Sequence, residues 1–158
     1  MNTDRTGTMT VDLASSKELQ TLLDLTPREF EHFVADVWQE RQEWTTEVMD
    51  SGPDRGLDVI GQPPNGGPKT AVQCKRYDPE SSQISEPNVR EYAALRQQWE
   101  DVEGVTIVTT STFSRNAREI ADRLDVKCIN GEDLVRLVHR YNATEILNWY
   151  AAGRPEEW

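Results

Sequence analysis

Two short segments, D-R-G-L-D-V-I at residues 54–60 and T-A-V-Q-C-K-R at residues 70–76, decide how this chain folds. Both are rich in apolar and β-branched residues, as short buried strands are, and the Gly- and Pro-rich interval between them predicts a hairpin loop. Side chains alternate between the two faces of a strand, so Gln73 and Lys75 share one face. If the two strands pair, Asp58 lies near both, and a carboxylate, an amide oxygen and an ammonium group meet at the rim of a sheet.

These three groups are the minimum needed to hold Mg²⁺ against a phosphodiester and to activate a water molecule. Asp58 lies within an apolar strand, where an unpaired carboxylate is costly to bury, so it must meet a metal ion, another cation or water. A salt bridge to Arg55 or Arg76 is the structural alternative. Asp54 is a further candidate ligand, although its place in the sequence P-D-R-G also suits a turn.

The sequence D-R-G-L-D-V-I, followed by A-V-Q-C-K-R-Y, resembles the Mrr-type restriction endonuclease branch of the PD-(D/E)XK nuclease superfamily. The likeness extends over roughly residues 25–140 and includes the Gln that this branch often carries at the second acidic position. It implies a metal-dependent DNA endonuclease with Mg²⁺, or alternatively Mn²⁺, as its cofactor and DNA as its partner. The resemblance assigns the metal to Asp58, Gln73 and Glu31, and it gives Lys75 the assisting role.

Glu31 and Lys75 each have an ordinary structural alternative. Many nucleases of this superfamily use a Glu on the first helix, and Glu31 lies beside an apolar helical stripe from which it can reach the edge of the sheet; otherwise it is a solvated helix carboxylate. Lys75 can orient or deprotonate the attacking water and offset charge on the phosphorane. Its alternative role is that of a lysine at a strand end that extends into solvent.

Hydroxyl and arginine side chains follow the strand predicted at 104–109 and lead into the amino terminus of a helix. Backbone N–H groups and the helix dipole at such a position suit phosphate. Capping by Ser114 explains part of this pattern without any ligand. The candidate DNA- or phosphate-binding residues are Ser111, Ser114, Arg115, Arg118 and Arg76.

The pattern along the chain predicts a mixed α/β fold. A capping box at residues 26–29 opens an amphipathic helix with apolar residues at helical spacing. The further predicted elements are strands at 44–49, 54–60, 70–76, 104–109 and 126–129, a hairpin loop at 61–68, and helices at 85–99, from 114 and from 130 to 150. An antiparallel start followed by crossovers implies a mixed central β-sheet with helices on both faces, in the order α-β-β-β-α-β-α-β-α. This order is also the core shared by restriction-endonuclease-like proteins.

The composition fits one acidic domain. We expect residues 17–150 to form it, with flexible tails at 1–16 and 151–158. The net charge of -11 argues at first sight against nucleic acid as a partner. However, the basic residues are 13 Arg and 4 Lys, and an acidic, lysine-poor surface is also expected of a halophilic protein. An acidic domain that avoids DNA is the other interpretation. Two cysteines in predicted strands suggest small buried hydrophobic residues rather than a disulfide or zinc site.

The sequence has neither a membrane-spanning run nor a signal peptide, so a cytoplasmic location is the default expectation. The predicted role is restriction of foreign or modified DNA. The alternatives are a Holliday-junction-resolvase-like or repair nuclease, and a catalytically silent DNA-binding module that retains the fold. Cleavage of two strands with one site per chain implies a homodimer, for which the aromatic carboxy-terminal helix is a plausible contact.

Overall fold

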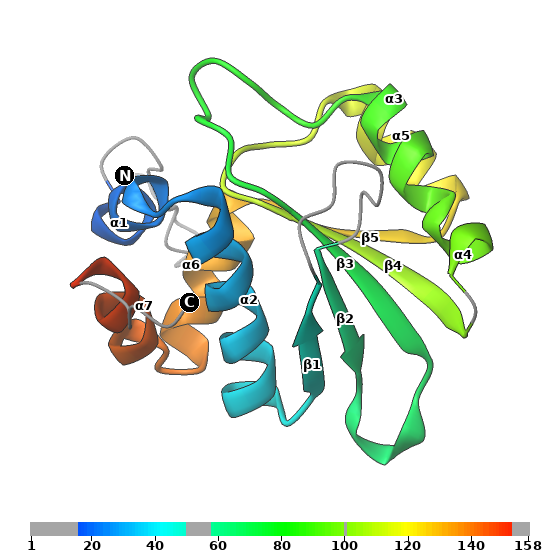
Figure 1. Cartoon of the computed structure of the whole chain (residues 1–158). Helices are drawn as coiled ribbons and strands as arrows, with labels where there is room; N and C mark the ends of the chain where they lie inside the picture. Colours follow the sequence, from blue (N-terminus) through cyan, green and yellow to red (C-terminus); the bar gives the residue numbers. More distant parts are fainter. Residues whose placement is uncertain (1–15, 50–57, 100, 153–158) are drawn as a thin grey trace, which may run out of the picture.

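The computed structural model describes residues 16–49, 58–99 and 101–152 of the chain (Figure 1). The two predicted tails lie almost wholly outside these ranges. The candidate ligand Asp54 also lies outside them. The tail boundaries and any role of Asp54 therefore stay predictions.

A mixed five-stranded sheet forms the centre of the molecule (Figure 1). Its strands stand in sequence order, and β1–β2 and β2–β3 are antiparallel, whereas β3–β4 and β4–β5 are parallel. The strands are β1 (Thr45–Val48), β2 (Val59–Gln62), β3 (Lys69–Lys75), β4 (Val102–Thr109) and β5 (Val126–Ile129). This arrangement confirms the predicted fold class.

Helices cover both faces of the sheet, as predicted. One apolar cluster joins the sheet to α1, α2, α6 and α7, and a second joins the opposite face to α3, α4 and α5 (Figure 1). The helices are α1 (Lys17–Asp24), α2 (Pro27–Gln42), α3 (Glu86–Ala93), α4 (Leu95–Gln98), α5 (Arg115–Arg123), α6 (Gly131–Arg140) and α7 (Thr144–Ala151). Within the described residues, no helix has both the length and the apolar character needed to cross a bilayer.

The predicted capping box begins α2. The Thr26 side chain accepts a hydrogen bond from the Glu29 N–H at 3.1 Å, and the Glu29 carboxylate accepts one from the Thr26 N–H at 2.8 Å. Phe30 and Phe33 of the predicted apolar stripe are fully buried against the sheet. Glu29 is therefore engaged in the cap, and Glu31, one position beyond Phe30, is the carboxylate that α2 can offer to the sheet.

The loop between β2 and β3 is shorter than predicted. Gly61 was assigned to the loop, but it pairs with Thr46 on one side and with Thr70 on the other. A Cβ atom at Gly61 would lie 2.7 Å from the ring of Trp44. This glycine therefore serves close packing inside the sheet. The remaining loop contains a short 3₁₀ turn, η1 (Pro64–Gly66).

Three helices differ from the prediction. α1 was not predicted; Ser16 caps it, and Leu19 and Leu22 are buried. The helix predicted at 85–99 divides into α3 and α4, and Arg96 of α4 donates hydrogen bonds to the carbonyls of Glu103 and Leu124. The final predicted helix divides into α6 and α7. Its break contains Asn142, whose left-handed φ of 53° cannot continue a right-handed helix.

Candidate active site

Asp58 joins β2 to β3 at the point where the ladder between these strands ends. The last Cα pair of this ladder is Val59 with Val72. One position beyond it, the Asp58 carboxylate accepts a hydrogen bond from the Cys74 N–H at 2.8 Å. Cys74 lies between Gln73 and Lys75, so the structure brings the three motif residues together at the rim of the sheet.

Glu31 reaches the same place from α2. Its carboxyl group makes a hydrogen-bonding contact with Asp58, and only 13% of its side chain is exposed. Arg28 Nη1 donates to Glu31 Oε1 at 3.1 Å and to the Met49 carbonyl at 2.7 Å, which ties α2 to the end of β1. The predicted proximity of Glu31 to the sheet edge is therefore observed, and Arg28 holds it there.

The two carboxyl groups perturb each other. Burial and then the charge of Asp58 raise the pKa of Glu31 to about 7, against the opposing effect of Arg28. Burial also raises the pKa of Asp58, although the Cys74 hydrogen bond and the charge of Lys75 oppose the rise. Two buried carboxylates this close favour a shared proton or a bound cation.

Gln73 precedes Cys74, the residue whose N–H bonds Asp58, on β3. Its side chain is only 2% exposed, and no donor among the described residues bonds its Oε1 atom. A buried carbonyl oxygen without a donor costs about 1–3 kcal/mol. Two carboxylates and an amide oxygen form the hard-oxygen donor set that Mg²⁺ and Mn²⁺ prefer, so the residues present fit such an ion. No group of three His, Cys, Asp or Glu residues suited to a metal occurs within the described ranges.

Lys75 packs against α3. Its Nζ atom lies 5.4 Å from the centroid of the Tyr92 ring. Burial alone would lower the pKa of Lys75, but the hydrogen bond to Tyr92, with the nearby charges of Tyr92, Tyr77 and Asp58, raises it above its ordinary value. The Lys75 carbonyl accepts from the Thr109 hydroxyl at 2.7 Å, which anchors the end of β3. The contact with Tyr92 thus fixes the position of the charged Lys75 side chain near the carboxyl pair.

Sequence reasoning missed Arg28 and Tyr92. The spacing of Arg28 and Glu31, three residues apart on one helix, was a readable sign of an ion pair. Tyr92 lies in the helix predicted at 85–99 and is only 4% exposed. Its position opposite Lys75 depends on how α3 crosses the sheet, and no local pattern reports that.

Three of the predicted phosphate-binding residues make structural contacts. Ser111 is fully buried, and its hydroxyl donates to the Ser82 carbonyl. Ser114 accepts from the Ala117 N–H at 3.0 Å and caps α5, which is the structural alternative stated for it. Arg76 Nη1 donates to the Leu23 carbonyl at 3.1 Å.

The two predicted arginines of α5 differ in their surroundings. Arg115 is exposed and forms a 3.5 Å ion pair with Glu119 one helical turn away. Arg118 instead lines a pocket beside β5. In the described part of the chain, no hydrogen bond or ion pair joins any of the five predicted phosphate-binding residues to the carboxyl pair, and their role stays a prediction.

Comparison with known proteins places the fold. The chain resembles the solved structure of AspBHI, a DNA modification-dependent restriction endonuclease, with a TM-score of 0.66 and 18% identity over 92% of this chain. It also resembles the MspJI restriction endonuclease, solved in complex with a 27-mer oligonucleotide, with a TM-score of 0.63 and 25% identity over 94% of this chain. The protein of unknown function AF1548 has a TM-score of 0.61 and 16% identity, covering 74% of this chain and 67% of that one.

This chain is shorter than the two restriction endonucleases, since it spans 42% of AspBHI and 40% of MspJI. Among curated proteins, none matches the sequence. The Mrr_cat family, described as restriction endonuclease, matches residues 22–138. This match confirms the resemblance inferred from the motif residues. Because it covers well over half of the sequence, the chain belongs to the Mrr_cat restriction endonuclease family.

Proposed function

We propose that this chain is a DNA endonuclease that hydrolyses phosphodiester bonds with the help of Mg²⁺ or Mn²⁺. One observation carries the proposal. The carboxyl groups of Glu31 and Asp58 crowd together, and the Lys75 ammonium lies near Asp58. Asp58 bonds to Cys74, the neighbour of Gln73, whose Oε1 atom is buried without a partner among the described residues. Membership of a restriction endonuclease family supports the same activity.

The roles of the residues follow from their surroundings. Asp58, Glu31 and Gln73 would hold the ion, and a divalent cation in such a place supplies Lewis-acid stabilisation of phosphate and a more acidic water. Lys75 stays protonated at neutral pH because its pKa is raised. It therefore orients water and offsets negative charge on the phosphate rather than serving as a base. Tyr92 holds the ammonium in position.

Restriction of foreign or modified DNA is the biological role that we propose. The support is the family, together with the likeness in fold to a DNA modification-dependent restriction endonuclease. Because this chain spans about two fifths of that protein, its target sequence or modification is left open. Junction or repair cleavage is the alternative nuclease role, and a preference for four-way junctions over linear duplex would support it.

A homodimer is the assembly that we propose, because one site per chain must cut two strands. Trp149 on α7 supports the predicted contact, since it is a large hydrophobic side chain with 46% exposure. Its ring lies edge-on to Tyr150, with centroids 4.7 Å apart. Analytical sedimentation of the wild-type protein and of the Trp149→Arg variant tests this proposal. The wild-type protein should sediment as a dimer and the variant as a monomer, and a wild-type monomer contradicts the proposal.

Plasmid nicking tests the enzymatic proposal. We expect wild-type protein to nick supercoiled DNA with Mg²⁺ or Mn²⁺ and to be inactive in EDTA, over a salt range that extends to molar concentrations because the protein is acidic. Lys75→Ala should abolish nicking. Lys69→Ala is the matched control, since Lys69 begins the same strand at its far end, and this variant should stay active. Equal nicking by the Lys75 variant would contradict the assigned site, and no nicking by any protein would favour a silent DNA-binding module.

A further inference from the structure

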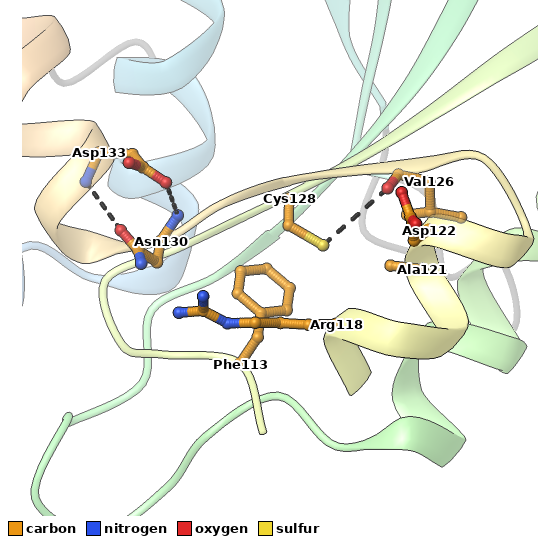
Figure 2. Close-up of a pocket in the computed structure, with 8 residues that line it drawn as sticks. All are labelled: Phe113, Arg118, Ala121, Asp122, Val126, Cys128, Asn130 and Asp133. Atoms are coloured by element: carbon orange, nitrogen blue, oxygen red, sulfur yellow. Dashed lines mark hydrogen bonds between the residues drawn. The ribbon is translucent and has the colours of Figure 1, made fainter. Parts of the chain in front are cut away.

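Two adjoining pockets flank β5, the strand at the free edge of the sheet. The first, about 340 Å³, lies on the α5 side and includes Phe113, Arg118 and Asn130 (Figure 2). The second, about 300 Å³, lies on the α6 side and includes Lys127, Arg136 and Arg140. Cys128 and Asp133 line both pockets, so they form one continuous surface around the edge strand.

This surface has more positive than negative side chains although the chain is strongly acidic, because its lining includes four cations and the two carboxylates of Asp122 and Asp133. We call Arg118, Lys127, Arg136 and Arg140 the β5 basic surface. Arg136 is paired with Glu132 at 2.6 Å and Asp133 at 3.6 Å. Within the described residues, the side chains of the other three make no ion pair or hydrogen bond. With a net charge of -11 over the whole chain, three uncommitted cations around one strand form a local site for an anion.

The register of the sheet relates the α5 side of this surface to the candidate active site, whereas Lys127, next to Cys128 on β5, lies on the α6 side. Cys128 pairs with Ile107, and Ile107 pairs with Gln73, so the pockets stand at the level of Gln73 and two strands away. Two strand spacings amount to about 10 Å. Cys128 also packs against the same apolar cluster as Ile107, which lies on the sheet face toward α3 and α5. In Figure 2, Arg118 extends from α5 along this face toward Asn130.

The strand order suits a DNA duplex. A duplex with one phosphate beside Lys75 on β3 can extend past β4 to the edge strand β5, where its backbone meets basic side chains. A second copy of this chain suits the surface poorly. Lys127 is the exposed residue of β5, and a lysine on an edge strand opposes pairing with another strand. Two such surfaces would also bring like charges together.

We propose that the β5 basic surface binds the backbone phosphates of a DNA duplex on one side of the cleavage position. This inference rests on the proposed endonuclease function and adds to it a second contact region, in which Lys127 and Arg140 act with Arg118. Phosphate contacts of this kind set the affinity and the register of the duplex without reading its sequence.

The test measures binding of a fluorescent duplex by anisotropy in EDTA, over a series of salt concentrations. Each phosphate contact contributes about 0.9 to the slope of log affinity against log salt. The double variant Lys127→Ala/Arg140→Ala should weaken binding several-fold and reduce the slope by about 2, and Arg118→Ala should reduce it by about 1. The matched control is Lys69→Ala/Arg123→Ala, which also removes two positive charges without described ion pairs but away from β5. It should keep the wild-type slope.

The inference is overturned by wild-type slope and affinity in the double variant, by an equal loss in the control, or by no DNA binding by wild-type protein at any salt. Polyglutamate is tested as a competitor of the fluorescent duplex. If it displaces the duplex as well as unlabelled DNA of equal charge does, the inference is overturned in favour of an acidic protein partner. Circular dichroism verifies folding, and Lys127→Gln/Arg140→Gln repeats the test with longer side chains. Binding in EDTA is independent of cleavage, so the two proposals can fail separately. If wild-type protein binds DNA through β5 but does not nick it, only the endonuclease proposal is contradicted. If wild-type protein nicks DNA but the β5 variants bind as well as wild type, only this inference is contradicted.

Discussion

Replacement of Glu31 by Gln should stabilise the metal-free protein. The Glu31 side chain is only 13% exposed, and its pKa is about 7 because of burial and the charge of Asp58. At pH 8 the folded protein therefore carries an ionised carboxylate in a place that favours the neutral form. Gln has nearly the same shape and no charge, so it removes this unfavourable term.

The size and sign follow from linkage. The pKa of Glu31 is about 7 in the folded protein against 4.5 for the ordinary group. At about 1.36 kcal/mol per pH unit, this difference corresponds to about 3 kcal/mol, and residual solvent exposure reduces it to roughly 2. The folded protein binds the Glu31 proton more tightly than the unfolded chain does. The contribution of this proton to the free energy of unfolding is therefore fully present below pH 4.5 and is lost as the pH rises to 7. The gain from Gln is therefore largest above pH 7 and mostly gone at pH 5.

Urea unfolding in EDTA at pH 5, 6, 7 and 8 measures the effect. Glu119→Gln is the control, because Glu119 is exposed in a surface pair, and its effect should stay within about 0.5 kcal/mol at each pH. Addition of Mg²⁺ should stabilise the wild type more than Glu31→Gln, since an ion that binds the folded state shifts the equilibrium toward it. Equal or lower stability of Glu31→Gln at pH 8, or a gain that does not change with pH, would refute the reasoning.

Three further substitutions have expected outcomes in urea unfolding. Gly131→Ala should lower the free energy of unfolding by about 2 kcal/mol or more, because its Cβ would lie 2.4 Å from the Thr110 carbonyl oxygen; a neutral effect would mean that the backbone yields easily. Thr26→Ala should cost about 1 kcal/mol through loss of the α2 cap, and Thr26→Ser should restore it. Gln73→Glu should destabilise the protein in EDTA at pH 8 by adding a third buried carboxylate, and Mg²⁺ should reverse the loss; equal stability in both conditions would argue against a cation site.

Local chemistry explains which parts of the fold were predictable. α2 has a complete capping box and a long apolar stripe, so local and tertiary preferences agree over its length. α1 has only 8 residues, against 16 in α2, in which to show periodicity, and its buried leucines depend on packing against α6 and α7. The break after α6 had a readable sign, because Asn142 is one of the residue types that adopt the left-handed conformation. The break after α3 had none, since Arg96 bonds to carbonyls distant in sequence.

The same distinction applies to the candidate site. Asp58, Gln73 and Lys75 share a rim because strand alternation and hairpin pairing are local rules, and both are readable from the sequence. The contribution of Glu31 depended on a resemblance, because nothing local says how far α2 lies from the sheet. The contact between Lys75 and Tyr92 required the path of α3 across the sheet. Predictability thus fell with the number of elements that a contact joins.

Gln73 can be understood from the electrostatics of this rim. Glu31 and Asp58 already have raised pKa values, so the metal-free protein folds against carboxylate repulsion. A third carboxylate at a position only 2% exposed would add to that repulsion with little solvent to screen it. An amide keeps the oxygen and removes the charge. On the proposed function, Gln73 in place of a carboxylate therefore weakens the attraction for a divalent cation and reduces the electrostatic destabilisation of the metal-free protein. This trade predicts that cation affinity and metal-free stability change in opposite directions when this residue is exchanged between Gln and Glu.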